Sequence, residues 1–454
     1  MKKLIKTLCL SLATITAMTL AACGKGPNND SNNGGNIGNE SSDSPRIMIA
    51  ASADPIEQEI AKTFVKAYLA QPGNENKRFS VQQIGDPYDS WMQRQMYAKK
   101  LPDIVQVYDY KAEYWTGENL LVPVSDYMKR DGISEDNYFS AVIEMAKSKA
   151  GDDNMYWVPR DYNKVVCVYN TKMFELAGVA EPTDGWTFED FENICKALKE
   201  KEAVLKEYAG GKTVWAANIN VDWAAVYYPI MKSFGGELID TENGTAFKNE
   251  EAVKKTIDFL CDYVDKGYAV STIDTMDTGS VFGNKQCAMW FTVRPNVPDV
   301  YDNVDGNINF VSFPKLTGVE TSYIGMGCSG YGITTSCSQE KRELAWDFLK
   351  FVMSEEGQEA FCAAGGGIPM IKSLAEKSDA AFRTVYPNLN NNVFVENADR
   401  DLPMTYMKGF LPEKQLGIYN TILNNMMSSF YKVKPEERAD RLAIVKGYIE
   451  KTFK

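Results

Sequence analysis

The side chains of this sequence that could do chemistry are carboxylates and aromatic rings, because the chain contains no histidine. Without histidine, neither a Ser-His-Asp nor a Cys-His nucleophile can form, and imidazole metal sites are excluded. Acid–base chemistry would have to rest on carboxylates, Lys, Tyr or Cys. Binding chemistry is open, since sugar rings stack on aromatic faces and sugar hydroxyls pair with charged, planar groups. We therefore predict no cofactor and no metal. Together with the order of the motifs described below, the absence of histidine also predicts no catalytic residues.

The elements that would position such side chains are clearest at residues 46–109. Strands are predicted over 46–52, 78–85 and 103–109, and helices over 54–70 and 88–99. This alternation is typical of a parallel sheet in a doubly wound α/β lobe. Ligands of such sheets bind beyond the carboxyl ends of the strands, so this edge is the candidate site.

Candidate ligand-binding residues follow from the strand ends. Asp54, Tyr108 and Asp109 stand at or just beyond predicted strands, and Arg294 follows the later strand "QCAMWF". Trp115 ends the polar loop "DYKAEYW". The alternative for each charged residue is a surface ion pair that contributes little. The alternative for Trp115 is packing in the core.

The segment "GMGCSG" at 325–330 matches the glycine pattern of dinucleotide sites letter for letter. Such a site needs a strand before the motif and a helix after it. Here the β-branched, strand-like "YGITTSC" follows, so we do not predict a nucleotide site. We expect these glycines to let the backbone approach the binding cleft closely.

The N-terminus has the pattern of an export signal with a lipid anchor. Three lysines precede an apolar run over 8–20, which is shorter than the roughly 20 residues of a membrane span. Leu20-Ala21-Ala22-Cys23 follows and resembles a bacterial lipobox. We predict a signal peptide over 1–22, lipidation at Cys23 and a disordered tether over 23–45, which is rich in Asn, Gly and Ser. The alternative is a plain signal peptide with an incidental cysteine.

Length, charge and cysteine usage limit the remaining body. It is too long for one compact core, which favours two lobes. A formal charge of −12 disfavours nucleic acid and anionic lipid as partners. An odd number of singly spread cysteines is typical of buried free thiols rather than a disulfide framework. These are Cys167, Cys195, Cys261, Cys287, Cys328, Cys337 and Cys362.

Five stretches in order carry a resemblance to a known family. They are "VVCVYNTKMFELAGVAEPTDGWTFEDF", "GGELIDTENGTAFKNEEAVKKTIDFL", "VFGNKQCAMWF", "NFVSFP" and "ELAWDFLKFVMSEEGQEAF…GGGIPM". From about residue 46 to 375, the chain resembles the extracellular solute-binding proteins of carbohydrate ABC transporters, of the maltodextrin-binding type. The last eighty or so residues match only as a helical tail.

The resemblance implies a two-lobed, periplasmic-binding-protein-like α/β fold. Each lobe would be a doubly wound sheet flanked by helices, with the ligand enclosed between the lobes. Three crossings would join them, near Val158 to Asp161, near Phe313 and Pro314, and near Ile368 and Pro369. The first lobe would then comprise residues 46–158 and 314–368, and the second 159–313 and 369–454 with the helical tail.

The resemblance also adds candidate ligand contacts. Arg160 and Asp161 fall at the first crossing, where both lobes meet. Trp223, followed by Tyr228, occupies the region where the family places ring-stacking residues. Trp290 lies on a strand near the cleft. For the tryptophans, core packing is the alternative.

The function that these features predict is a membrane-anchored substrate-binding component of an ABC importer. It would capture a sugar, expected to be an oligosaccharide, and deliver it to permease subunits. We expect a monomer that contacts the membrane through its anchor alone, on the outer face of the cytoplasmic membrane or the periplasmic side. No nucleic-acid partner is expected.

Two alternatives stay open. An exported glycoside hydrolase needs only two carboxylates and no histidine. A binder of a non-sugar solute could use the same fold. The order of the family motifs favours the receptor, and no glycosidase motif accompanies them. The sequence does not fix the sugar, its length or its linkage.

Overall fold

The computed structural model describes residues 35–85, 87–240, 242–270, 278–363, 367–403, 426–431 and 433–452. A six-stranded sheet forms the centre of the first lobe. Its strand order is β1 (Gly35–Gly38), β3 (Arg78–Ile84), β2 (Arg46–Ser52), β4 (Ile104–Tyr108), β14 (Ser329–Ile333) and β5 (Val158–Pro159). β2 pairs in parallel with β3 and β4, which confirms the predicted alternation. β2 is buried along most of its length, as expected for a parallel strand covered by helices on both faces.

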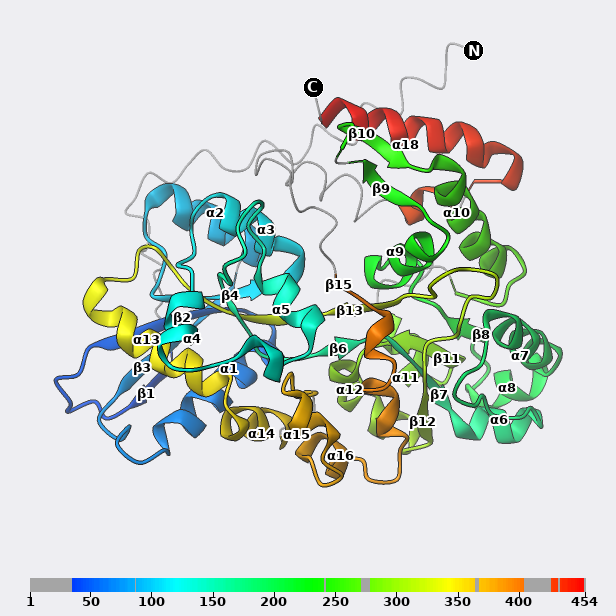
Figure 1. Ribbon diagram of the computed structural model, residues 1–454. Coiled ribbons are helices and arrows are strands. Elements are labelled where there is room, and N and C mark those ends of the chain that lie inside the picture. Colours follow the sequence, from blue (N-terminus) through cyan, green and yellow to red (C-terminus); the bar gives the residue numbers. More distant parts are fainter. Residues whose placement is uncertain are drawn as a thin grey trace, which may run out of the picture. The chain divides into compact units, whose positions relative to one another are not determined.

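Helices flank this first sheet. α1 starts where Asp54 accepts a hydrogen bond from the Ile56 N–H and where proline occupies the first helical position, a favoured place for it. The helices of this lobe are α1 (Pro55–Leu69), α2 (Tyr88–Ala98), α3 (Asp109–Gly117), α4 (Ser125–Arg130), α5 (Ser140–Ala146), α13 (Gln339–Val352) and α14 (Glu355–Ala363) (Figure 1).

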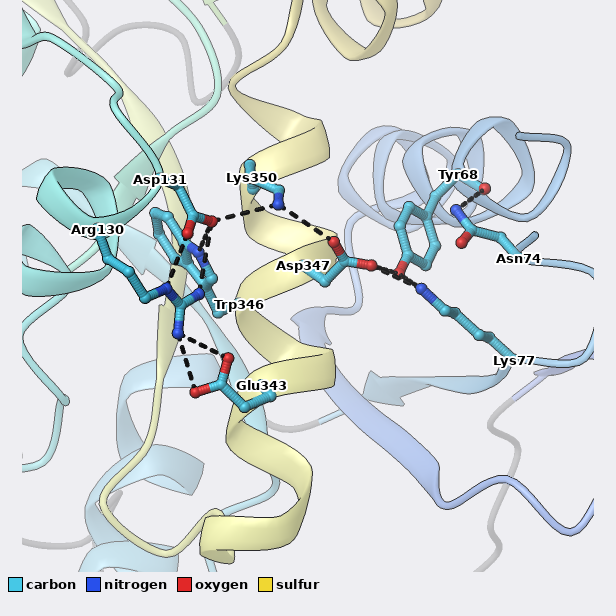
Figure 2. A network of polar contacts seen from close by, with 9 residues as sticks. All are labelled: Tyr68, Asn74, Lys77, Arg130, Asp131, Glu343, Trp346, Asp347 and Lys350. Atoms are coloured by element: carbon cyan, nitrogen blue, oxygen red, sulfur yellow. Dashed lines mark hydrogen bonds and ion pairs between the residues drawn. The ribbon is translucent and has the colours of Figure 1, made fainter. Parts of the chain in front are cut away.

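One of these helices, α13, is held by a chain of polar contacts (Figure 2). Asp347 accepts hydrogen bonds from the Tyr68 hydroxyl and the Lys77 ammonium, each at 2.6 Å. Lys350 lies one turn along the same helix and pairs with Asp131 at the end of α4, at 3.2 Å. The network therefore ties α13 to the end of α1 on one side and to α4 on the other.

The second lobe has its own four-stranded sheet, ordered β12 (Ile308–Val311), β7 (Val166–Asn170), β11 (Cys287–Thr292) and β8 (Trp215–Asn218). This sheet is mixed, because β7 runs antiparallel to both of its neighbours while β11 and β8 are parallel. β9 (Glu237–Asp240) and β10 (Thr245–Lys248) form a separate antiparallel pair, in which β9 packs on α9 and β10 on α18.

The helices of the second lobe include one whose start is fixed by side-chain hydrogen bonds. Thr187 caps α7, and its hydroxyl and the Asp190 carboxylate satisfy each other's backbone N–H groups in a capping box. The main helices are α6 (Thr171–Ala177), α7 (Phe188–Glu200), α8 (Glu202–Tyr208), α9 (Ala224–Ser233), α10 (Glu250–Asp265), α11 (Thr278–Gly283), α12 (Pro298–Tyr301) and α18 (Arg438–Thr452). α18 packs on β10, which makes the C-terminal helix part of this lobe (Figure 1).

A third, short sheet lies where the chain passes between the lobes. It consists of β15 (Asp401–Pro403), β13 (Ile324–Gly327) and β6 (Asn163–Lys164). The second crossing lies later in the chain than the predicted Phe313 and Pro314, because Lys315 still pairs with Thr187 of the second lobe. The Tyr323 N–H likewise donates to Ser233 at 2.9 Å, and the chain joins the first sheet only at Ser329.

The third crossing is also later than the predicted Ile368 and Pro369. The Met370 carbonyl accepts a hydrogen bond from Phe139, so this segment still belongs to the first lobe. The chain reaches the second lobe by Asn390, whose N–H donates to Asn309 at 2.8 Å. α15 (Lys372–Glu376) and α16 (Ala381–Thr384) lie between these two points.

The start of the described chain differs from the predicted tether. Residues 35–38 form β1, which pairs antiparallel with β3, and Ile37 packs on the first-lobe core. The prediction of disorder over 23–45 is therefore wrong at β1. The physical reason is that β3 presents unpaired backbone groups to which a short segment can add. Cys23 and the predicted signal over 1–22 lie outside the described residues.

The seven cysteines predicted to be free and buried are so in the structure. Burial raises the pKa of the Cys261 and Cys337 thiols to about 12. Across the ranges that the structure describes, no helix combines the length and the apolar character needed to cross a membrane.

Candidate ligand-binding site

Five of the predicted site residues meet at the carboxyl edge of the first sheet. β2 and β4 are parallel, so their ends bring Asp54 and Tyr108 to the same edge. Asp109 follows Tyr108 directly, and Arg160 and Asp161 follow β5 of the same sheet. Asp54 is exposed and caps α1, with its carboxylate 2.9 Å from the Ile56 N–H.

Arg160 is the centre of a buried ion network at this edge. Two of its nitrogens pair with the Glu57 carboxylate, one of them at 2.8 Å, and Nε lies 3.3 Å from Asp161. Only 3% of the Arg160 side chain is exposed. Burial by itself would lower the pKa of Arg160, but the Glu57 and Asp161 carboxylates hold it above its ordinary value.

The network fixes the first crossing to the sheet edge. Gln106 of β4 donates to Glu57 at 2.6 Å, and Asp161 accepts the Ser329 N–H of β14 at 2.9 Å. Each of the three guanidinium nitrogens of Arg160 thus has a carboxylate partner. This arrangement favours a structural role for Arg160 and Asp161, and their predicted contact with ligand stays a prediction.

Asp109 is also held by the protein. Its carboxylate accepts the Cys328 N–H at 2.9 Å and the Tyr110 N–H at 2.6 Å. Burial raises the pKa of Asp109 to about 6, and the nearby Asp161 carboxylate adds to the rise.

A group of aromatic rings lies at the start of α3, where Asp109 follows Tyr108 in the chain. The Tyr108 and Tyr110 rings stack with centroids 5.3 Å apart and planes inclined by 11°. Tyr88 meets Tyr108 edge-on at 6.0 Å and stacks with Trp91. Tyr108, Tyr110 and Trp91 are half-buried, so they keep ring surface for a ligand. Tyr110 was missed as a candidate, although its position two residues beyond Tyr108 in a strand-to-helix turn was a usable signal.

The second lobe contributes an exposed tryptophan beside a carboxyl group without a partner. Trp223 precedes α9 and is 36% exposed. In the neighbouring Asp222, the buried Oδ1 atom has no hydrogen-bond partner, and burial raises the pKa to about 6. Asp222 was missed by sequence reasoning, and its only sequence signal is its place before Trp223.

Three other predicted aromatic residues are buried in cores. Trp115 and Tyr228 have little exposed surface. Trp290 stacks on Phe282 at 5.7 Å. Trp115 was assigned to a polar loop, but "DYKAEYW" lies in α3, whose side chains are mostly buried. Burial favours packing roles for all three, and their contact with ligand stays a prediction.

Arg294 is fully buried as well. It donates to the Phe382 carbonyl at 3.3 Å and lies over the Tyr386 ring at 4.5 Å. Burial lowers its pKa to about 10. These contacts favour a role in attaching residues 382–386 to the second lobe.

The sequence pattern of the bacterial extracellular solute-binding proteins matches residues 59–385 of this chain. The chain belongs to that family. The resemblance identified from the five stretches is thereby confirmed. Curated relatives include binding proteins of Brucella abortus and Brucella suis, which are 24% identical over 259 residues. This match covers 54% of the present chain and only 58% of each relative.

Solved structures with the same fold include several ABC-transporter binding proteins. A substrate-binding protein of Listeria monocytogenes in complex with cycloalternan has a TM-score of 0.72 and 20% identity, and covers 90% of this chain and 99% of its own. The sugar-binding protein MalE of Xanthomonas citri has a TM-score of 0.71 and 17% identity, with 90% and 97% covered. UgpB of Mycobacterium tuberculosis, in complex with glycerophosphocholine, has a TM-score of 0.70 and 16% identity, with 90% and 98% covered. The predicted two-lobed fold is confirmed for this solute-binding protein.

Proposed function

We propose that this solute-binding protein captures an oligosaccharide between its two lobes and delivers it to the permease of an ABC importer. The observation that carries the proposal is the exposed ring of Trp223 at the start of α9. A ring of this kind can stack on the apolar face of a sugar. The half-buried Tyr108–Tyr110 pair of the first lobe offers a second ring surface.

Two of the similar structures support a saccharide, since one is a complex with cycloalternan and another is a sugar-binding protein. A third is a complex with glycerophosphocholine, so a glycerophosphodiester is the solute to exclude. A thermal-shift screen should therefore include cyclic glucans, linear maltooligosaccharides, other oligosaccharides and glycerophosphocholine. At a concentration of about 100 Kd, a ligand that binds only the folded protein adds about 2.7 kcal/mol of stability. A response to glycerophosphocholine alone would contradict the proposal.

We propose that the protein does not catalyse a reaction on its ligand. The carboxylates of the first-lobe edge are already engaged, Glu57 by Arg160 and Asp109 by two backbone N–H groups. The glycoside-hydrolase alternative needs one carboxyl to protonate the leaving group and another to act as nucleophile or base. Incubation with each bound glycan should leave that glycan intact, and a shortened product would favour the hydrolase.

We further propose that residues 1–22 are a signal peptide and that Cys23 carries a lipid anchor, on the Leu-Ala-Ala-Cys junction. The protein would then act as a monomer tethered to the outer face of the cytoplasmic membrane. We assign residues 46–158 and the segment from β14 to Met370 to the first lobe, with the second crossing before Ser329 and the third between Met370 and Asn390.

A further inference from the structure

The strand that returns to the first lobe passes unusually close to both lobes. A Cβ atom added at Gly325 would lie 1.8 Å from the Ala225 carbonyl oxygen of α9. One added at Gly330 would lie 2.0 Å from the Val158 carbonyl oxygen of β5. Real Cβ atoms do not approach this closely, so no other residue fits without a shift of backbone. These glycines belong to "GMGCSG", which lacks a following helix and instead runs through β13 into β14.

The middle glycine of this segment, Gly327, contacts Asp109. A Cβ atom at Gly327 would lie 2.7 Å from Asp109 Oδ2. The same oxygen accepts the Cys328 N–H at 2.9 Å, and the Asp109 N–H donates to the Cys328 carbonyl at 3.2 Å. β4 and β14 pair as far as Tyr108 and Ser329. The Asp109 side chain therefore supplies the next rung of the ladder, where a backbone carbonyl would otherwise be.

The other carboxylate oxygen of Asp109 binds the backbone of a residue of the ring pair. Oδ1 accepts the Tyr110 N–H at 2.6 Å, and in the chain Asp109 separates the two stacked tyrosines, Tyr108 and Tyr110. One carboxylate thus joins the crossing strand to the turn that carries both rings. Any movement of β13 relative to the first sheet must change one of these hydrogen bonds.

We propose that Asp109 is a positioning residue that couples the crossing strand to the Tyr108–Tyr110 ring pair, and that Gly327 is required for this contact. The inference rests on the proposed function only where it treats the ring pair as a surface for sugar. This positioning role of Asp109 differs from the direct contact with ligand that the sequence predicts. A carboxylate is suited to the task because it accepts two N–H groups at once, one on each oxygen.

The test uses the full chain labelled with 3-fluorotyrosine and no added solute, so its result does not depend on which ligand the protein binds. Resonances of Tyr108 and Tyr110 are assigned with single Tyr→Phe variants. We expect both to shift with pH around a midpoint near 6 in the wild type, as the carboxyl of Asp109 loses its proton. Asp109→Asn should abolish that titration.

Two other titratable groups lie near this carboxyl, Asp161 at the first crossing and the Cys328 thiol on the crossing strand. Arg160, which pairs with Asp161, lies near the same thiol. A titration that persists in Asp109→Asn would come from Asp161 and would overturn the proposal. Gly327→Ala should shift both tyrosine resonances and speed amide exchange over residues 324–333. Gly447→Ala is the matched control, because a Cβ atom there meets nothing within 4 Å. Tyrosine resonances that are the same in Gly327→Ala and Gly447→Ala would also overturn it.

Discussion

Replacing Glu57 by alanine should destabilise the protein strongly. The change leaves the Arg160 guanidinium buried without the carboxylate that pairs with two of its nitrogens. The side chains of Arg160 and Glu57 are only 3% and 14% exposed, so water can replace the lost partner only in part. Removing one member of a buried ion pair typically costs about 3–5 kcal/mol.

The structure places this case at the lower end of that range. Asp161 stays 3.3 Å from Nε and continues to compensate the charge. We therefore expect a loss of about 3 kcal/mol in the free energy of unfolding. At about 2–4 °C per kcal/mol for a domain of 150–250 residues, the melting temperature should fall by roughly 6–12 °C.

The assay is urea and thermal unfolding followed by circular dichroism. Glu59→Ala is the matched control on the same helix, because Glu59 pairs with Lys66 at 3.7 Å with both side chains largely exposed. Such surface pairs contribute about 0–1 kcal/mol. Replacing Glu57 and Arg160 by methionine together with Asp161→Asn should recover much of the stability, since no unpaired charge is then buried. If Glu57→Ala and Glu59→Ala have the same melting temperature, the network does not stabilise the first crossing, and the structural role that we assign to Arg160 is wrong.

Three further outcomes are expected. Trp223→Ala should weaken binding of a glycan found in the screen by roughly ten- to hundredfold, or about 1–3 kcal/mol, while the melting temperature of the unliganded protein changes little. Calorimetric titration measures this, with Tyr97→Ala, the loss of another exposed ring, as the control. Unchanged affinity with a sharp loss of stability would assign Trp223 to packing. Asp222 has a raised pKa of about 6, so its protonated form stabilises the fold at low pH, and this contribution is lost as pH rises through about 6. Asp222→Asn should flatten the fall in unfolding free energy between roughly pH 4 and 6 in urea titrations, and an unchanged slope would show that the carboxyl is not desolvated. Cys23→Ser should move the protein from the membrane fraction to the medium or periplasm of a bacterial host, whereas identical fractionation would exclude the anchor.

Local sequence patterns predicted the elements well, because the period of the apolar residues is a property of neighbouring positions. The strands and helices from Arg46 to Tyr108 were all visible in this way. The family resemblance then supplied the arrangement of the two lobes. The crossings were misplaced because contacts with residues distant in sequence, such as Lys315 with Thr187, decide where a segment belongs.

The site was harder to predict than the fold, because side-chain roles depend on such distant partners. Arg160 is occupied by Glu57, which lies 103 positions away in the chain. Asp222 is notable because its Oδ1 has no partner at all, and a sequence carries no sign of that. Asp109 was correctly placed at the end of a strand, but its partner Cys328 is 219 positions away.

The pairing of β1 with β3 changes what the edge of the first sheet offers to another molecule. β3 has seven residues, and without β1 its outer backbone groups would be open to a strand from a second protein. β1 covers Arg78 to Val81 and is itself only four residues long, with glycine at both ends. Short edge strands are poor templates for intermolecular pairing. We propose that the protein is anchored to a membrane, where neighbouring copies cannot diffuse apart. There this short segment would guard against aggregation through the sheet edge.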